Sequence, residues 1–170
     1  MTKATTRLVL LIGICATIGC DRVTKHIAAT TLPDAPTQSF LADTVRLGYT
    51  ENTGGFLGLG ADWPLPVRTT IFGIGNALAL VALVVVAVRG RWPSPAPLGV
   101  ALYVAGGASN LVDRLAHGMV IDFMNVGIGP LRTGIFNVAD MAIMMGAALL
   151  ITSGYRSIHT PHTIAANRSD

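Results

Sequence analysis

Long apolar stretches alternate with short polar, Gly- and Pro-containing segments along this chain. The clearest stretch, Thr69–Val88, has no charged residue and matches the roughly 20 apolar residues that a helix needs to cross a bilayer. The alternation predicts helical spans at about 7–29, 67–88, 97–113 and 136–155. We therefore expect an all-α membrane protein with four transmembrane helices.

The first apolar stretch has a second interpretation. Leu8–Cys20 follows two basic residues and carries no charge, so it also has the length and flank of a secretory signal peptide. We favour a transmembrane helix that reaches Ala29. On such a helix Asp21 and Lys25 are four positions apart, share one face and can pair, which lowers the cost of burying either charge. The alternative is an exposed ion pair at a helix end, which contributes little.

The segment 30–66 differs in composition, because four prolines interrupt it and proline breaks helices. Two pieces, SFLADTVRLGYT and FLGLG, carry β-compatible residues between turn signals and predict short strands. We expect a small β-rich cradle outside the membrane. Within it, Gly54 of the sequence ENTGGF would let the backbone approach a ligand closely, although the pattern Asn52–Gly54 alone is typical of an ordinary hairpin turn.

Polar residues gather at the end of the third predicted span, in the sequence GGASNLVDR at 106–114. If the helix continues through Arg114, then Asn110, Asp113 and Arg114 lie on one face at positions i, i+3 and i+4. Asp113 and Arg114 could equally be a charge pair at the membrane interface.

Two further aspartates flank the next link. Asp122 lies in VIDF at 120–123, which is predicted to be a short extended piece, and Asp140 is the only charge of the last span. A Gly- and Pro-containing link at 127–134 leads to that span. Asp122 could be a turn residue, and Asp140 could support the dipole of a helix that is capped by Asn137.

Four spans place both termini on one side, and the positive-inside rule makes that side cytoplasmic. The opposite side also holds six basic residues, but eight of the nine acidic residues accompany them. We expect a single integral-membrane domain over residues 1–156 and a flexible cytoplasmic tail over 157–170. The following polar residues would then all lie at the outer membrane face: Asp21, Asn52, Asp113, Asp122, Asn137 and Asp140.

The composition agrees with a membrane protein. Hydrophobic residues make up 51% of the chain and charged residues 12%, which is half the roughly 25% of a typical soluble protein. The net charge of +3 comes without a run of Lys or Arg, so nucleic-acid binding is not expected. Cys15 and Cys20 both lie in the first apolar stretch, and no Cys/His spacing indicates a zinc site.

Asp122 and Asp140 are the candidates for chemistry. Two carboxylates held close together cannot both ionise freely, so they share one proton. The ionised member can take a proton from water while the protonated member hydrogen-bonds a substrate carbonyl. This pair can hydrolyse a peptide bond without a metal, a cofactor or a nucleophilic Ser or Cys. The sequence contains no GxSxG or HExxH motif that would compete with it.

Five motifs carry a resemblance to a known family. They are DRVTK at 21–25, NTGGF at 52–56, GGASNLVDR at 106–114, VIDF at 120–123 and FNVAD at 136–140. In these motifs and their order the chain resembles the lipoprotein signal peptidases, the type II signal peptidases of bacteria. The resemblance implies four helices with a β-rich cradle on the periplasmic side, in the bacterial inner membrane, with the active site at the periplasmic face.

The resemblance also implies roles for residues and partners. Asp122 and Asp140 would be the catalytic aspartates. The substrate would be a prolipoprotein that already carries diacylglycerol on its lipobox cysteine, cut immediately before that cysteine by a monomeric enzyme among membrane lipids. Cyclic peptides of the globomycin type would inhibit it. Substrate-binding or supporting roles would fall to Asp21, Lys25, Asn52, Gly54, Asn110, Asp113, Arg114 and Asn137.

Two departures from the family pattern concern the geometry of the substrate-binding wall. Ser109 stands where the family usually has Gly, and NTGGF is one residue shorter between Asn52 and Phe56 than is usual. Two other protein classes stay open. DRLAHGMVID loosely resembles the spaced aspartates of the CDP-alcohol phosphotransferases, which are metal-dependent lipid enzymes. A small ion-coupled transporter could use Asp113 or Asp140 as its carrier group.

Overall fold

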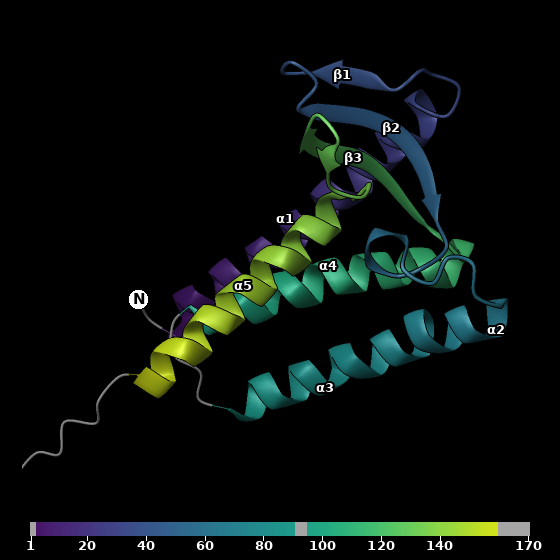
Figure 1. Ribbon diagram of the computed structural model, residues 1–170. Coiled ribbons are helices and arrows are strands. Elements are labelled where there is room, and N and C mark those ends of the chain that lie inside the picture. The colour runs from purple at the N-terminus through teal and green to yellow at the C-terminus, as the bar shows by residue number, and fades with distance from the viewer. Residues whose placement is uncertain (1–2, 91–94, 160–170) are drawn as a thin grey trace, which may run out of the picture.

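The computed structural model describes residues 3–90 and 95–159, and it is mostly helical with one small antiparallel sheet (Figure 1). The sheet stands at one end of the long helices, which we call the sheet end. The remaining residues, among them most of the predicted tail, lie outside the described residues. The long helices are α1 (Lys3–Thr31), α3 (Asn76–Arg89), α4 (Ala96–His117) and α5 (Val138–His159).

The segment before α3 extends that helix without a break. Helix α2 (Leu65–Arg68) continues into a π-helical segment, η2 (Thr69–Gly75), and then into α3. Together they form Leu65–Arg89, which alone among the described helices is long and apolar enough by composition to cross a membrane, with a mean hydropathy of 2.6. A shorter apolar helix occupies Val138–Gly154.

The ends of α4 follow from its sequence. Proline occupies the first turn, where the missing N–H removes no intrahelical bond. At the other end Gly118 has a φ of 73°, and its N–H bonds to the carbonyl of Arg114 at 3.0 Å. Glycine is the residue that adopts this left-handed cap without strain. The predicted end at about 113 is therefore one turn short, because α4 runs on to His117.

Small residues let α4 lie close against α5. A side chain on Gly99 would meet the carbonyl oxygen of Gly146 at 2.9 Å, and one on Gly106 would collide with the backbone of Ala139. Both contacts are possible only for glycine. In a membrane, where burying apolar surface gives no advantage over lipid, such close backbone packing is what stabilises a helix pair.

The sheet has four strands in the order β1-β2-β3-β4. The first hairpin joins β1 (Gln38–Phe40) and β2 (Val45–Asn52), and the second joins β3 (Val120–Ile128) and β4 (Leu131–Arg132). The central strands β2 and β3 pair antiparallel, with Thr50 opposite Asp122 and Val45 opposite Val126.

The extended piece predicted at 120–123 is confirmed as the start of β3, but two other predictions for the cradle, the link at 127–134 and the strand at FLGLG, were wrong. Half of the sheet comes from 120–132, where a short extended piece and a link were expected; Gly129, with a φ of 54°, instead makes the tight turn between β3 and β4. FLGLG is no strand, because Phe56–Gly58 forms a 3-10 turn, η1. The strands expected in SFLADTVRLGYT are present as β1 and β2.

A small apolar core fixes the sheet to the helices. Ala28 and Leu32 at the end of α1 pack with Phe123 of β3, and side chains such as Leu47 and Ile121 surround them. Because this contact joins strand to helix, the position of β3 relative to the helix ends is set by packing rather than by a loop alone.

Candidate active site

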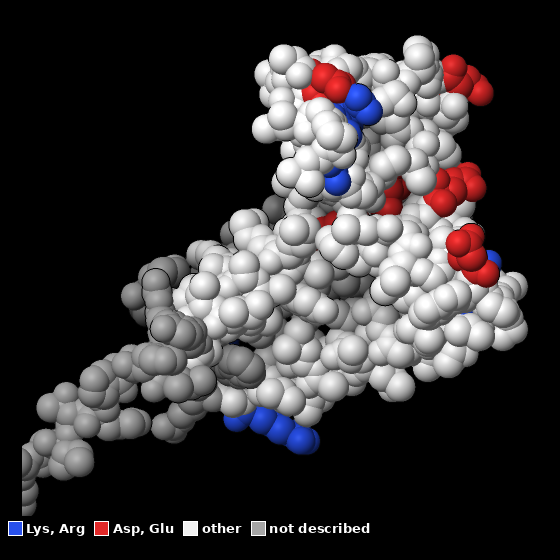
Figure 2. Space-filling view, in the orientation of Figure 1, with Lys and Arg blue, Asp and Glu red and all other residues white. Residues whose placement is uncertain are grey.

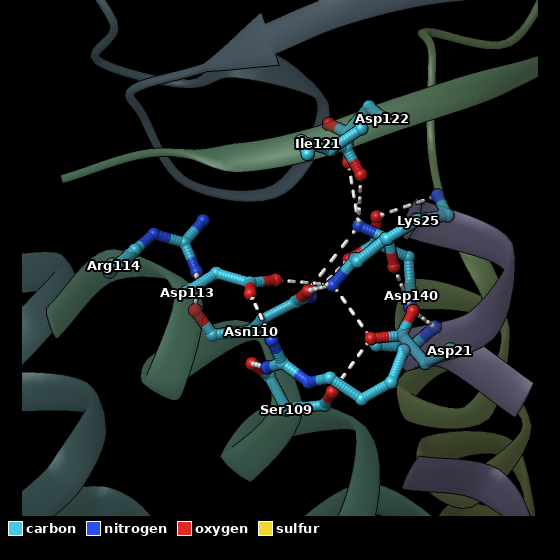
Figure 3. A network of polar contacts seen from close by, with 12 residues as sticks. Asp21, Lys25, Ser109, Asn110, Asp113, Arg114, Ile121, Asp122 and Asp140 are labelled. Atoms are coloured by element: carbon cyan, nitrogen blue, oxygen red, sulfur yellow. Dashed lines mark hydrogen bonds and ion pairs between the residues drawn. The ribbon is translucent and has the colours of Figure 1, made fainter. Parts of the chain in front are cut away.

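Asp122 is a buried carboxylate on β3, only 1% exposed. Its Oδ1 accepts a hydrogen bond from Asn137 Nδ2 at 2.6 Å, and its Oδ2 accepts one from Asn52 Nδ2 at 2.8 Å. Figure 3 shows Asp122 pointing from the strand toward the helix ends, where the other labelled side chains gather. The structure thus brings together residues from β2, β3 and the start of α5.

Asp140 stands in the first turn of α5 and is 6% exposed. Its Oδ1 accepts from Asn110 Nδ2 at 2.9 Å, and its Oδ2 accepts from the backbone N–H of Asn137 at 3.1 Å. In return Asn137 Oδ1 accepts from the backbone N–H of Asp140 at 2.9 Å. This reciprocal pair is a capping box.

Asn137 therefore has two functions. The sequence left open whether it only caps the last helix, and it does cap that helix, but its Nδ2 also donates to Asp122. Backbone pairing places it there, because Phe136 N–H bonds to Met124 O at 2.8 Å and Met124 N–H bonds to Phe136 O at 2.9 Å. One asparagine thus connects both aspartates.

Burial changes the acidity of Asp122. Removal of the carboxylate from water raises the pKa of Asp122 to about 6, and the negative charge of Asp140 acts in the same direction. The amide donors of Asn52 and Asn137 oppose this shift without cancelling it. Asp122 can therefore hold a proton at a pH where an exposed aspartate has lost it.

Lys25 is the centre of a buried ionic cluster beneath the aspartates (Figure 3). Its ammonium, 4% exposed, lies 2.7 Å from Asp21 Oδ2 and 2.7 Å from Asp113 Oδ2, and it donates to Asn110 Oδ1 at 2.7 Å. The predicted pairing of Asp21 with Lys25 is confirmed. Since Asn110 donates to Asp140, one amide links the cluster to the candidate site.

Asp21 also fixes the start of α5. Its Oδ1 accepts from the backbone N–H of Ala139 at 2.9 Å, which is one of the donors that the first turn of a helix leaves without an internal partner. A carboxylate at this position is also favoured by the helix dipole. Helix α1 thereby holds the helix that carries Asp140.

Two members of the cluster were missed from the sequence, Arg22 and Ser109. Arg22 Nη1 lies 2.5 Å from Asp113 Oδ1, and its Nη2 donates to the carbonyl of Ser109 at 2.7 Å. The Ser109 hydroxyl donates to Asp21 Oδ2 at 2.6 Å. The departure from the usual Gly thus adds a hydrogen bond to the cluster. The only sequence signal for Arg22 was its place beside Asp21.

Arg114 holds the loop that follows β2. Its Nη2 and Nε both donate to the carbonyl of Gly54, at 2.7 and 3.2 Å. Asn52 shapes the same loop, because its Oδ1 accepts from Gly54 N–H at 2.9 Å and its Nδ2 donates to Gly55 O at 3.0 Å. Asn52–Gly54 is therefore a turn that also delivers an amide to Asp122.

A cavity of about 210 Å³ opens beside Asp140. Its wall is mainly apolar and aromatic, with polar groups where Asp140 lies. The lining residues that matter here are Phe56, Phe72, Tyr103, Asn110, Asp140 and Ile143. Phe72 belongs to the π-helical segment and stacks on Trp63 at 6.0 Å between ring centroids. An apolar wall with few polar groups is typical of a ligand site.

The arrangement defines a class of protein. Two buried carboxylates share one asparagine, and an apolar cavity adjoins one of them at the end of long apolar helices. Among the described residues, no group of three His, Cys, Asp or Glu side chains is placed to hold a metal ion. Two such carboxylates are the groups that acid–base hydrolysis by paired aspartates requires.

Comparison with known proteins identifies the family. The family model described as signal peptidase (SPase) II matches residues 13–156. The chain belongs to the signal peptidase II family, a family of aspartic peptidases. It is 32% identical to a lipoprotein signal peptidase of Desulforapulum autotrophicum over 88% of this chain and 92% of that protein. It is 35% identical to one of Chlorobium phaeobacteroides strain BS1, over 83% and 93%.

Two solved structures of bacterial membrane enzymes have a similar fold. One has a TM-score of 0.78 at 24% identity and covers 89% of this chain and 90% of that chain. The other has a TM-score of 0.72 at 26% identity, over 85% and 90%. The first shows the fold alone.

Proposed function

We propose that this chain is a membrane aspartic endopeptidase that cuts diacylglyceryl-modified prolipoproteins immediately before the lipidated cysteine. Family membership supports the reaction, and the relatives carry the name lipoprotein signal peptidase. The observation that carries the assignment to Asp122 and Asp140 is that Asn137 contacts both carboxylates, by its side chain and its backbone N–H.

The mechanism uses the difference between the two carboxylates. Asp122, whose pKa burial raises to about 6, is the protonated member and hydrogen-bonds the scissile carbonyl oxygen. Ionised Asp140 takes a proton from the attacking water, whose oxygen bonds to the carbonyl carbon as Asp122 gives its proton to the carbonyl oxygen. The resulting diol collapses when Asp140 passes its proton to the leaving nitrogen and Asp122 recovers the diol proton.

The surrounding amides orient the pair. Asn52 donates to one oxygen of Asp122, and Asn110 donates to one oxygen of Asp140. These fixed donors, rather than solvent, set the orientation of the two carboxylates. The cavity beside Asp140 then receives apolar groups of the substrate against Phe72 and Ile143. We expect globomycin-type cyclic peptides to compete for this cavity.

The proposed topology has α1, the helix Leu65–Arg89, α4 and α5 crossing the bacterial inner membrane, with both termini in the cytoplasm. Support comes from charge placement: in Figure 2 the acidic side chains in view gather on the sheet and the sheet end, whereas the prominent charged patch on the helices away from that end is basic. The charges of α1 and α4 that would be costly in lipid are paired in the cluster around Lys25. The sheet and both aspartates then lie at the periplasmic face of a monomer.

The test is cleavage of a purified diacylglyceryl prolipoprotein by Asp122→Asn and Asp140→Asn variants in lipid vesicles. We expect each to lose at least about 10³-fold in turnover, as when a central catalytic group is removed, while still inserting. Asp34→Asn, at an exposed site beyond α1, is the matched control and should cleave normally. Normal turnover by either site variant would contradict the assignment.

Chelation separates this proposal from the metal-dependent phosphotransferase class. The peptidase should keep its rate in EDTA, whereas a metal-dependent lipid enzyme should stop. A transporter would be indicated by ion flux in vesicles that survives globomycin and does not require a prolipoprotein.

A further inference from the structure

The free end of the sheet exposes four large apolar side chains. Leu131 is 82% exposed, Ile128 79%, Leu41 75% and Phe40 46%. Phe40 ends the first strand and Leu41 begins the turn after it, while Ile128 and Leu131 flank the turn of the second hairpin. We call these four residues the hairpin tip. Large apolar side chains gathered in this way mark contact sites on protein surfaces.

The two hairpins form one surface rather than two separate loops. Gly127 N–H bonds to Thr44 O at 2.9 Å, and Arg132 Nη1 donates to Asp43 O at 2.7 Å. A shallow hollow of about 500 Å³ is lined by Thr44 of the first hairpin and by residues of the second hairpin that include Ile128 and Leu131. Figure 1 shows both turns at the same end of the sheet.

The turn of the first hairpin has an uncommon backbone conformation. Leu41, Ala42 and Asp43 have φ values of 52°, 50° and 66°, a left-handed conformation that costs free energy for any residue with a side chain. Asp43 stabilises it by accepting from Ser39 Oγ at 2.7 Å and from Arg46 Nε at 2.7 Å. Glycine adopts this conformation at lower cost, yet the turn carries Leu41, whose side chain is exposed.

The position of the tip identifies what covers it. The sheet is fixed to the end of α1 by the core of Ala28, Leu32 and Phe123, and the second hairpin lies directly beside the start of α5 (Figure 1). The tip therefore stands next to the point where an apolar helix enters the bilayer. Behind it lie Asp43, Arg46 and Arg132, which together carry one excess positive charge, as suits the phosphate layer of a membrane surface.

We infer that the hairpin tip inserts into the interfacial layer of the same bilayer that the helices cross, and that phospholipid covers Phe40, Leu41, Ile128 and Leu131. The strand β3 connects this anchor to the candidate site, because Asp122 and Ile128 belong to the same strand. An anchored tip fixes the tilt of β3 against α5 and holds the two aspartates at the depth where a membrane-bound substrate presents its scissile bond.

The depth of the tip can be measured with spin labels in lipid vesicles. Cys15 and Cys20, the two cysteines of the chain, are replaced by Ala, and single cysteines are placed at Leu131, Ile128, Asp34 and Val81. We expect labels at 131 and 128 to be relaxed mainly by oxygen, which enters lipid, and only weakly by a water-soluble nickel chelate. The label at Asp34, exposed beyond the end of α1, should show the reverse.

Val81, 61% exposed on α3, is the reference for the bilayer interior. If the label at 81 is relaxed by the nickel chelate, the proposed membrane topology itself fails. If the label at 81 behaves as expected but the labels at 131 and 128 are relaxed by the nickel chelate as strongly as the label at 34, the tip lies in water and the inference is overturned. Spin–spin broadening at 131 that disappears on dilution with lipid would also overturn it, because a second copy would then cover the tip.

A functional measurement tests the consequence. The double substitution Ile128→Glu and Leu131→Glu should raise KM for a prolipoprotein in vesicles several-fold while changing kcat by less than twofold, since neither side chain touches the aspartates. In detergent micelles the same variant should match the parent. An unchanged KM in vesicles would contradict the proposed role; if the double variant fails to fold, the single labels still decide the depth.

Discussion

The two proposed catalytic aspartates lie on different kinds of structure and are held in different ways. Asp122 lies on a strand, and each of its carboxylate oxygens accepts a hydrogen bond from a neutral side-chain amide. Asp140 stands in the first turn of a helix, and Asn110 links it to the ionic cluster around Lys25. On the strand side the carboxylate has only amide partners and its pKa is raised to about 6. On the helix side the carboxylate is connected through Asn110 to the charges around Lys25.

The largest effect on stability should come from removing the ammonium group at the centre of the ionic cluster on the helix side. Lys25→Met removes the ammonium that Asp21 and Asp113 share, and both carboxylates are buried. Removing one partner of a buried ion pair costs roughly 3–5 kcal/mol because a charge remains without compensation. We expect a large fall in melting temperature in detergent, with loss of prolipoprotein cleavage.

A second substitution sharpens this result. Lys25→Met combined with Asp21→Asn removes one charge of each sign, and asparagine can still accept from the N–H of Ala139. The double variant should recover part of the lost stability. If it is no more stable than Lys25→Met alone, then charge imbalance is not the reason for the loss.

The raised pKa of Asp122, on the strand side, should appear in the pH dependence of the free energy of unfolding. The pKa of Asp122 is about 6 in the folded protein, against an ordinary value of 3.8. Between these values the folded chain keeps a proton that the unfolded chain has released, so stability is full below about pH 4 and falls as the pH rises through 6. The full difference is about 3 kcal/mol.

Asp122→Asn checks this prediction, because it removes the titrating group and keeps the shape. Unfolding by denaturant, followed from pH 4 to pH 7, should show a smaller loss of stability in the variant than in the parent. If the free energy of unfolding falls equally with pH in the variant and the parent, then Asp122 is ionised in the folded state already at low pH, contrary to its burial.

The helical part of this fold is readable from sequence because its signals are local. An uncharged run located α3, a run with the single charge of Asp140 located α5, and the spacing of Asp21 and Lys25 predicted their pairing. The sheet was only half predicted, since β2 and β3 pair residues more than 70 positions apart, such as Thr50 with Asp122, and no local pattern carries such a contact. The glycines near 127–134 read as a link because a tight hairpin and a loose loop use the same residues.

The candidate site shows the same division. Convergence of the aspartates followed from topology alone, and the structure brings them together through Asn137. Arg22 was missed because its neighbour Asp21 faces the cluster, and adjacent helical positions point about 100° apart; the length of the arginine side chain overcomes that angle. Ser109 was recognised from the sequence as a departure from the family pattern. That its hydroxyl donates to Asp21, 88 positions away, follows only from the three-dimensional structure.

A medium effect is expected at the loop that joins the two sides. Arg114→Lys keeps the charge but replaces two N–H donors on the carbonyl of Gly54 with at most one. The loop that delivers the Asn52 amide to Asp122 then loses part of its support. We expect kcat/KM to fall about tenfold, which is about 1.4 kcal/mol, mostly through KM. Arg89→Lys, at the far end of α3, is the control, and an equal fall there would indicate a general membrane effect.

The smallest effect should come from Ser109→Ala, which removes one donor from Asp21 while the bonds of that carboxylate to Lys25 and Ala139 remain. A hydrogen bond to a charged group is worth about 1.5–3 kcal/mol. Because Asp21 keeps its other partners, we expect the lower end of that range, a fall of about 3–6 °C in melting temperature for a chain of this size. Ser109→Gly loses the same bond and adds the helix cost of glycine, so stability should decrease in the order Ser, Ala, Gly. An Ala variant as stable as the parent would show that Lys25 alone holds Asp21, and that the start of α5 depends on the ion pair rather than on the whole cluster.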